Sequence, residues 1–182
     1  VNRNALILDT VETQGEPHHS ALIIVDVQND FLHPDGFIGR NNMTGFLDMS
    51  LVPGMMENTK RLLDAAVEAN VLTVFVQMIG GIIHQSPAAI AQRRRIQGND
   101  GDGSCHENTW GADFYGDVRP TGREREVIVQ KHRYSAFWGT NLDQVLKSNG
   151  VKTMVMCGDA TSGCVESTTR DGFMNDYYVI TA

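Results

Sequence analysis

The stretch ALIIVDV, residues Ala21–Val27, is a run of apolar and β-branched side chains interrupted near its end by a carboxylate. Continuous apolarity over so short a run is typical of a strand buried on both faces, as in a parallel sheet. Four further runs of this kind follow along the chain: Val71–Gln77, Glu126–Gln130, Lys152–Cys157 and Tyr177–Thr181. The sequence therefore predicts five strands of a mainly parallel sheet.

Helical patterns occupy much of the sequence between these runs, at Met55–Ala69, Thr140–Ser148 and Cys164–Asn175. Repeated strand, helix, strand units with right-handed crossovers predict an α/β fold with three layers and a doubly wound sheet. We expect one domain over residues 1–182. The chain ends directly after the fifth run, where such a domain normally continues with a helix, so we expect a domain cut short at its C-terminus.

Two segments break the pattern and predict long loops. They are His33–Pro53 and Met78–Gly122, and the second contains the turn-forming run Asn99–Ser104, which we expect to be mobile. Loops of this length inside a compact domain are usually functional or partly disordered.

Composition narrows the class of protein. The net charge of −7 disfavours nucleic-acid binding, because phosphate neutralisation needs a basic face. No apolar run approaches the length of a membrane span, and the first residues show no apolar signal region. Three cysteines, with no metal-type spacing, suit a reducing compartment. We expect a cytoplasmic protein without nucleic-acid or membrane partners.

Charged residues follow the first and third predicted strands. Asp26 comes at the end of the first and Lys131 directly after the third. Taken singly, Asp26 is as well explained as a turn or cap residue, and Lys131 is better explained as a solvated charge at a strand end. Because the carboxyl ends of parallel strands meet at one edge, the two side chains can instead form an ion pair there.

Cys164 gives the strongest local signal. It follows Gly163 and opens the helical run after the fourth predicted strand. A helix N-terminus lowers the pKa of a thiol, and free amides in the preceding loop can stabilise an oxyanion. The alternative is an inert small residue at a helix start. Cys157, within an apolar strand, is predicted to be core, and Cys105, in a Gly-rich loop, an incidental exposed thiol.

Three segments together resemble the isochorismatase-like cysteine hydrolases: Ile23–Phe31, Lys131–Ser135 and Gly158–Thr168. The resemblance runs from Ala21 onward. Within the family, it is greatest to the branch of ureidoacrylate amidohydrolases and N-carbamoylsarcosine amidohydrolase. It implies an amidohydrolase that cleaves a C–N bond of a small ureido or carbamoyl amide and releases ammonia through an acyl-enzyme. The implied catalytic residues are Asp26, Lys131 and Cys164.

The resemblance has further implications. It implies a cis peptide at Asp159-Ala160, with the amides of Ala160 and Cys164 forming the oxyanion hole, and a homodimer or homotetramer. Nicotinamidases of this family carry an Asp-x-His metal motif, whereas Asp48 here is followed by Met49 and Ser50. We therefore predict an enzyme without metal or other cofactor and disfavour nicotinamide as substrate. Biuret-like and triuret-like amides stay open.

Substrate contacts must come from the loops around the predicted site. The candidates are Gln28, Asn29, Phe31, Glu107, Trp110, Tyr134 and Phe137. Trp110 together with Phe114 is equally well explained as a structural plug over the sheet.

Two rival hypotheses belong to other classes. In a phosphoryl-transfer domain Asp26 would be phosphorylated, but position 28 is Gln rather than a second carboxylate for Mg²⁺, and Asp30 is expected to point away. The other rival is a binding or scaffold protein on the same fold, which has no reason to keep a low-pKa thiol.

Overall fold

The computed structural model describes residues 7–43, 45, 47–97 and 103–182. Its centre is a sheet of five parallel strands in the order β3-β2-β1-β4-β5. The bounds are β1 Ser20–Val25, β2 Leu72–Met78, β3 Glu126–Lys131, β4 Thr153–Gly158 and β5 Tyr178–Thr181. Each strand starts and ends within two residues of its predicted bounds, so the predicted parallel α/β sheet is confirmed.

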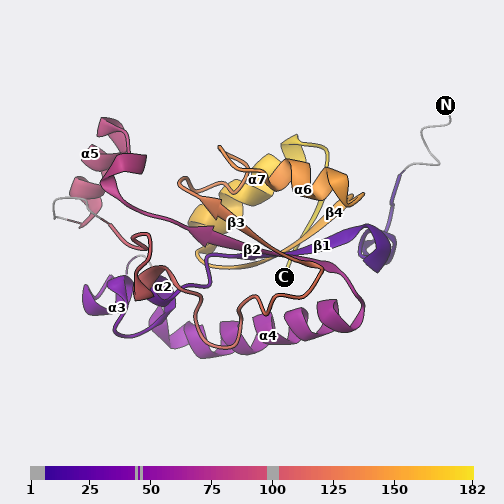
Figure 1. Cartoon of the computed structure of the whole chain (residues 1–182), viewed down its shortest axis with the longest axis horizontal. Helices are drawn as coiled ribbons and strands as arrows, with labels where there is room; N and C mark the ends of the chain where they lie inside the picture. The colour runs from indigo at the N-terminus through magenta and orange to yellow at the C-terminus, as the bar shows by residue number, and fades with distance from the viewer. Residues whose placement is uncertain (1–6, 44, 46, 98–102) are drawn as a thin grey trace.

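Helices cover both faces of the sheet (Figure 1). The long helix α4, Val52–Glu68, lies along one face, while α6, Leu142–Ser148, and α7, Glu166–Met174, lie along the other. The chain therefore forms the three predicted layers. Shorter elements are α1 Val11–Gln14, η2 Pro17–His19, α2 Asn29–Leu32, α3 Phe37–Arg40, η3 Met49–Leu51, η4 Ile82–His84, η5 Trp110–Ala112 and the π-turn η6 Thr161–Val165.

The predictions of two long loops were wrong in part. His33–Pro53 contains α3, η3 and the first residues of α4. The loop predicted over Met78–Gly122 is also interrupted. The segment contains the helix α5, Pro87–Gln97, which lies at the end of the molecule away from α1 (Figure 1). Its sequence gives no clear apolar stripe, because three consecutive arginines interrupt the pattern. Most of the run predicted to be mobile, residues 99–102, lies outside the described residues.

Burial in the core explains why the strand sequences are continuously apolar. Every residue of β1 is buried, and the central Phe75 of β2 is fully enclosed between the layers. Among the described helices, none is both long and apolar enough to cross a membrane.

The order of the strands locates the candidate site. The chain builds β1, β2 and β3 in one direction and then crosses to β4 and β5 on the other side of β1. In such sheets ligands bind beyond the carboxyl ends of the strands, where the direction of winding changes. This point lies between β1 and β4, and α2, α3 and α5 gather at the same edge of the sheet (Figure 1).

Candidate active site

Asp26 leaves the sheet directly after β1 in a left-handed backbone conformation, with φ of 53°. Its amide still donates a hydrogen bond to the Val76 carbonyl at 3.0 Å, which fixes the residue against the end of β2. The side chain is 1% exposed. A non-glycine residue with positive φ is uncommon, although Asp adopts it more readily than most, and it turns the carboxylate out of the strand direction.

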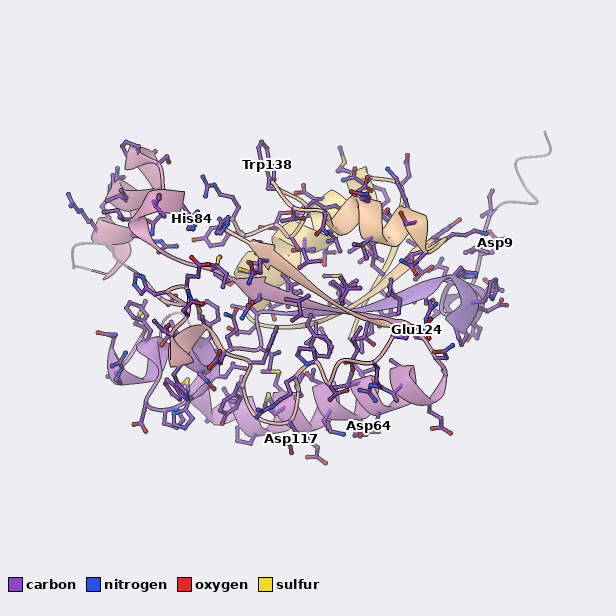
Figure 2. The ribbon with its side chains drawn as sticks, in the orientation of Figure 1. Asp9, Asp64, His84, Asp117, Glu124 and Trp138 are labelled. Carbon is purple, nitrogen blue, oxygen red and sulfur yellow. The ribbon has the colours of Figure 1, made fainter. Side chains whose placement is uncertain are left out.

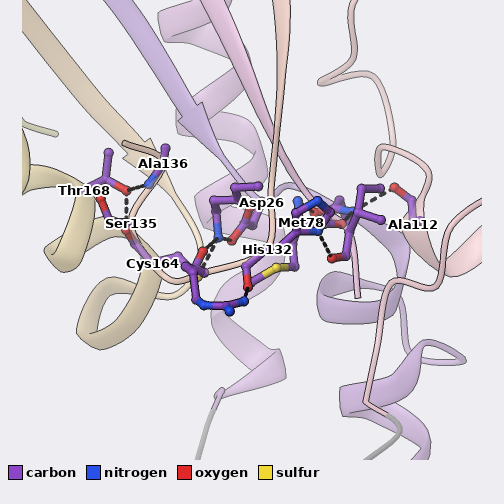
Figure 3. Close-up of polar contacts among 12 residues, drawn as sticks. Asp26, Met78, Ala112, His132, Ser135, Ala136, Cys164 and Thr168 are labelled. Atoms are coloured by element: carbon purple, nitrogen blue, oxygen red, sulfur yellow. Dashed lines mark hydrogen bonds and ion pairs between the residues drawn. The ribbon is translucent and has the colours of Figure 1, made fainter. Parts of the chain in front are cut away.

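Lys131 is the last residue of β3 and is fully buried. Its ammonium nitrogen Nζ lies 2.8 Å from Asp26 Oδ2 and donates hydrogen bonds to Cys164 Sγ at 3.1 Å and to the Arg133 carbonyl at 3.0 Å (Figure 3). The ammonium thus donates two hydrogen bonds and pairs with the Asp26 carboxylate through its charge. The structure brings together the three side chains that the sequence predicted to meet.

Cys164 lies in η6, between β4 and α7, and is 8% exposed. The chain enters this turn through Gly158, where a Cβ would come within 2.1 Å of the Val25 carbonyl oxygen. Glycine is thus required for β4 to run this close to β1. The peptide Asp159-Ala160 that follows is cis, as the resemblance implied.

Burial sets the protonation of this cluster. It raises the pKa of Asp26, an effect that the positive charge of Lys131 partly offsets. Burial alone would lower the pKa of Lys131, but the charge of Asp26 outweighs it and the pKa is raised. Burial and the Asp26 carboxylate raise the pKa of the Cys164 thiol. The prediction of a lowered thiol pKa was therefore wrong, because the effects of burial and of Asp26 both run in the opposite direction.

A further buried carboxyl group lies next to the cluster. Asp159 is 5% exposed, and burial together with the charge of Asp26 raises its pKa to about 7. Two carboxylates in one poorly solvated region disfavour ionising together. Asp159 is thus a second buried carboxyl group of raised pKa at this edge of the sheet.

The thiol opens into a small cavity of about 80 Å³. Its wall contains the apolar side chains Phe31, Phe37, Ile38, Met43 and Met78. A groove of about 720 Å³ runs beside α4 and η6, but Asp26, Lys131 and Cys164 do not line it. Cys164, the only one of the three that lines either space, assigns the site to the smaller one, whose size suits a small molecule.

Two predicted substrate residues line this cavity, Phe31 and the half-exposed Tyr134. Gln28 does not. Its buried amide donates to the Met78 and Ala112 carbonyls, and Asn29 Nδ2 donates to the Trp110 carbonyl at 2.7 Å. These two side chains hold the loops together, and both amide hydrogens of Gln28 are used in doing so.

The remaining predicted contacts lie outside the wall. Glu107 is exposed, and Phe137 packs against Tyr177 with ring centroids 6.1 Å apart. Trp110 is 50% exposed and contacts the His33 ring at its edge. Of the proposed plug over the sheet, only Phe114 packs on the core, against Phe75.

The structure agrees with the prediction for one of the other two cysteines and not for the other. Cys157 is 5% exposed, which confirms it as core. The prediction of an exposed Cys105 was wrong, because its side chain is fully buried and its amide donates to Asp30 Oδ2 at 2.7 Å. Asp30 also accepts a hydrogen bond from the Phe37 amide. The Asp30 carboxylate thus connects two loops. This role was not apparent from the sequence.

Thr168 is a buried residue that sequence reasoning missed. Its hydroxyl donates to the Cys164 carbonyl at 2.7 Å and accepts from the Ala136 amide at 3.0 Å (Figure 3). The hydroxyl thus connects η6, the turn that contains Cys164, to the loop that follows Lys131. A threonine in helical phase with the cysteine, four positions later, was the available signal.

Possible metal ligands gather elsewhere in the part of the chain that the structure describes. One group of three, Glu16, His18 and His19, has ligand atoms within 4.8 Å of one another. It precedes β1, at the opposite edge of the sheet from Asp26. The absence of a catalytic metal stays a prediction.

Comparison with known proteins agrees with this arrangement. The model of the isochorismatase domain matches residues 20–182, which include the whole sheet and all three clustered side chains. The chain belongs to the isochorismatase family.

Three known proteins are similar to the chain over most of its length. The chain is 32% identical to the ureidoacrylate amidohydrolase RutB of Agrobacterium fabrum, covering 90% of this chain and 73% of that one. A cysteine hydrolase from Pseudomonas syringae superimposes with a TM-score of 0.73 at 27% identity, over 92% and 72% of the two chains. N-carbamoylsarcosine amidase from Thermoplasma acidophilum gives 0.65 at 25% identity, over 90% and 80%. The protein is thus an isochorismatase-like hydrolase.

Proposed function

We propose that the protein is a cysteine amidohydrolase that cleaves the terminal C–N bond of a small ureido or carbamoyl compound and releases ammonia. One observation carries the proposal. The Lys131 ammonium lies within 3.1 Å of both the Asp26 carboxylate and the Cys164 sulfur, and Cys164 lines a cavity large enough only for a small molecule. A carboxylate, an ammonium and a thiol so arranged can move one proton and form one bond to a carbonyl carbon.

The first step is proton transfer from the Cys164 thiol to Asp26. A carboxylate of raised pKa is a stronger base than an ordinary one, and a thiol of raised pKa stays protonated until a substrate arrives. The sulfur then attacks the carbonyl carbon, and the proton on Asp26 passes to the departing nitrogen as ammonia leaves. Water next adds to the carbonyl carbon of the S-linked intermediate and gives a proton to Asp26. The Cys164 sulfur then leaves and recovers that proton from Asp26, as the acid product is released.

Lys131 and the turn η6 stabilise charge in these steps. The ammonium keeps Asp26 ionised in the resting enzyme and lies next to the sulfur while negative charge develops there. The amides of Ala160 and Cys164 are proposed to donate to the oxygen that becomes negative on attack. Such preorganised donors contribute about 3 kcal/mol each to catalysis in other hydrolases.

The substrate class rests on the relatives. Ureidoacrylate amidohydrolase and N-carbamoylsarcosine amidase are named for compounds that share a terminal carbamoyl group. A planar carbamoyl group attached to a short chain matches a narrow cavity with apolar walls.

The test is ammonia release from ureidoacrylate, N-carbamoylsarcosine, biuret, triuret and nicotinamide, in the presence of a chelator. We expect turnover of a ureido or carbamoyl compound by the wild type. Cys164→Ser and Asp26→Asn should each lose at least about 1,000-fold in kcat. Cys157→Ser, which changes a core thiol outside the site, serves as the control for a fold that is intact.

Two results would count against the proposal. Turnover that survives in Cys164→Ser would remove the thiol from the mechanism. Absence of ammonia from every compound, with folded wild-type protein, would favour a binding protein on this fold.

A further inference from the structure

The cavity at Cys164 is not wholly apolar. Besides the hydrophobic wall, the side chains of Gln92, Arg93, Ser104 and Tyr134 contribute to its lining. Arg93 is the only one of these that carries a permanent charge. It reaches the cavity from α5, the helix that sequence reasoning missed.

The guanidinium of Arg93 has an unmet hydrogen-bonding requirement. Its Nη1 is buried, and no described residue lies within hydrogen-bonding distance of it. A buried charged donor without a partner is costly, and such groups are rare in folded proteins. A partner supplied by a ligand removes the cost.

The backbone around this guanidinium leaves it room. At Gly103, with φ of 80°, a Cβ would lie 2.0 Å from Arg93 Nη1 and 3.9 Å from Gln85 Nε2. Only glycine allows the arginine to occupy this position. Both polar atoms of the Gln85 amide are also buried without a partner among the described residues. Two unsatisfied polar groups thus border the same glycine.

Charges near the cavity favour an anion. Asp26 and Lys131 form an ion pair and offset each other. Asp30, the buried carboxylate that adjoins the wall, is bonded to the Phe37 and Cys105 amides. Arg93 therefore remains as a positive charge without a described counterion. A guanidinium matches a planar carboxylate through two parallel hydrogen bonds.

We propose that Arg93 binds a carboxylate of the substrate, so that the enzyme selects ureido or carbamoyl compounds carrying a carboxylate over neutral ones. The inference rests on the proposed function and adds to it the chemistry of the group at the far side of the substrate from the reacting carbon. The apolar wall between would contact a short hydrocarbon spacer.

The experiment compares two ureido compounds of similar length, 3-ureidopropionate and neutral propylurea, by ammonia release. The wild type should have a kcat/KM for the anion at least about 10-fold above that for propylurea. Arg93→Met should lower the value for the anion about 10- to 100-fold, mainly through KM, and leave propylurea within about twofold. Arg93→Lys keeps the charge but loses the planar guanidinium. Its kcat/KM for the anion should lie between the values for the wild type and for Arg93→Met.

Arg94→Met is the matched control, because Arg94 is the exposed neighbour on the same helix. It should leave both substrates unchanged. Direct binding of 3-ureidopropionate to the Cys164→Ser protein, measured by calorimetry, should weaken in Cys164→Ser/Arg93→Met to the same degree as kcat/KM.

The outcomes separate the two proposals. Equal turnover of both compounds, or an equal loss for both in Arg93→Met, would overturn the role of Arg93 and leave the amidohydrolase standing. No ammonia from either compound, or from the wider panel, would overturn the proposed function and this inference together.

Discussion

Gln28 and Met78 exchange two hydrogen bonds: Gln28 Nε2 donates to the Met78 carbonyl at 2.9 Å, and the Met78 amide donates to Gln28 Oε1 at 2.8 Å (Figure 3). The side chain thus behaves as a short piece of strand that continues the pairing at the end of β2. It stands two residues after Asp26 and ties the backbone that carries the carboxylate to the sheet.

Replacing Gln28 with alanine should lower the free energy of unfolding by about 2–4 kcal/mol, because buried polar groups of Met78 lose their partner and a cavity forms. Urea unfolding measures this. Gln144→Ala, at an exposed position of α6, should change it by less than about 0.5 kcal/mol. Equal effects of the two substitutions would mean that the amide bridge adds nothing to stability.

Thr168→Val keeps the shape of a buried side chain and removes its hydroxyl. It should lower the free energy of unfolding by about 1–3 kcal/mol, since the Ala136 amide and the Cys164 carbonyl each lose a hydrogen-bond partner. We also expect kcat to fall about 10-fold with little change in KM, because the turn η6 loses its anchor. Thr168→Ser should retain most of the wild-type stability and most of the wild-type kcat. Identical behaviour of the valine and serine variants would contradict a role for the hydroxyl.

The protonation of Cys164 can be measured directly. Burial raises the pKa of its thiol above the ordinary 9.0, so the free enzyme holds a neutral thiol at neutral pH. The rate of alkylation by iodoacetamide, followed at the peptide containing Cys164, should therefore keep rising from about pH 7 to about pH 10. A plateau below about pH 8 would show a stabilised thiolate and reinstate the helix-dipole hypothesis.

Asp159 should make stability depend on pH. Burial raises its pKa to about 7, whereas the unfolded chain ionises near the ordinary 3.8. As the pH rises through this window the unfolded state loses its proton first, so the folded state is progressively destabilised. Relative to the wild type, Asp159→Asn should gain stability between about pH 4 and about pH 7, by an amount on the order of a few kcal/mol, and stay constant above.

Asp117→Asn is the control for this titration, because Asp117 is exposed beside α4 (Figure 2). If the Asp159→Asn difference does not change with pH, the Asp159 carboxyl group titrates as a solvated one.

The strands were predictable from the sequence because a strand buried on both faces is apolar at nearly every position. Continuous apolar runs at Ala21–Val25 and Met154–Cys157 have few alternatives, and polar residues directly after such runs must lie at the sheet edge. Asp26 and Lys131 could be predicted to meet for this reason.

The loop side chains were harder, because their positions depend on contacts between distant segments. The burial of Cys105 follows from a hydrogen bond to Asp30, 75 positions earlier in the chain. The sequence around Cys105 is rich in glycine and acidic residues, which is the composition of an exposed turn. Arg93 was overlooked for a similar reason, since three adjacent arginines are expected to face solvent and only the fold turns one inward.

The distribution of the triad over the sheet has a consequence for how the protein acquires activity. Asp26 and Cys164 follow β1 and β4, Lys131 ends β3, and β2 lies between the strands of Asp26 and Lys131. No hairpin or local segment can assemble them, because every pair depends on contacts between distant parts of the sequence, which form slowly. After dilution from denaturant, hydrolytic activity should therefore return more slowly than the helical circular dichroism signal. The rate at which activity returns should match the pairing of the last strand with the sheet.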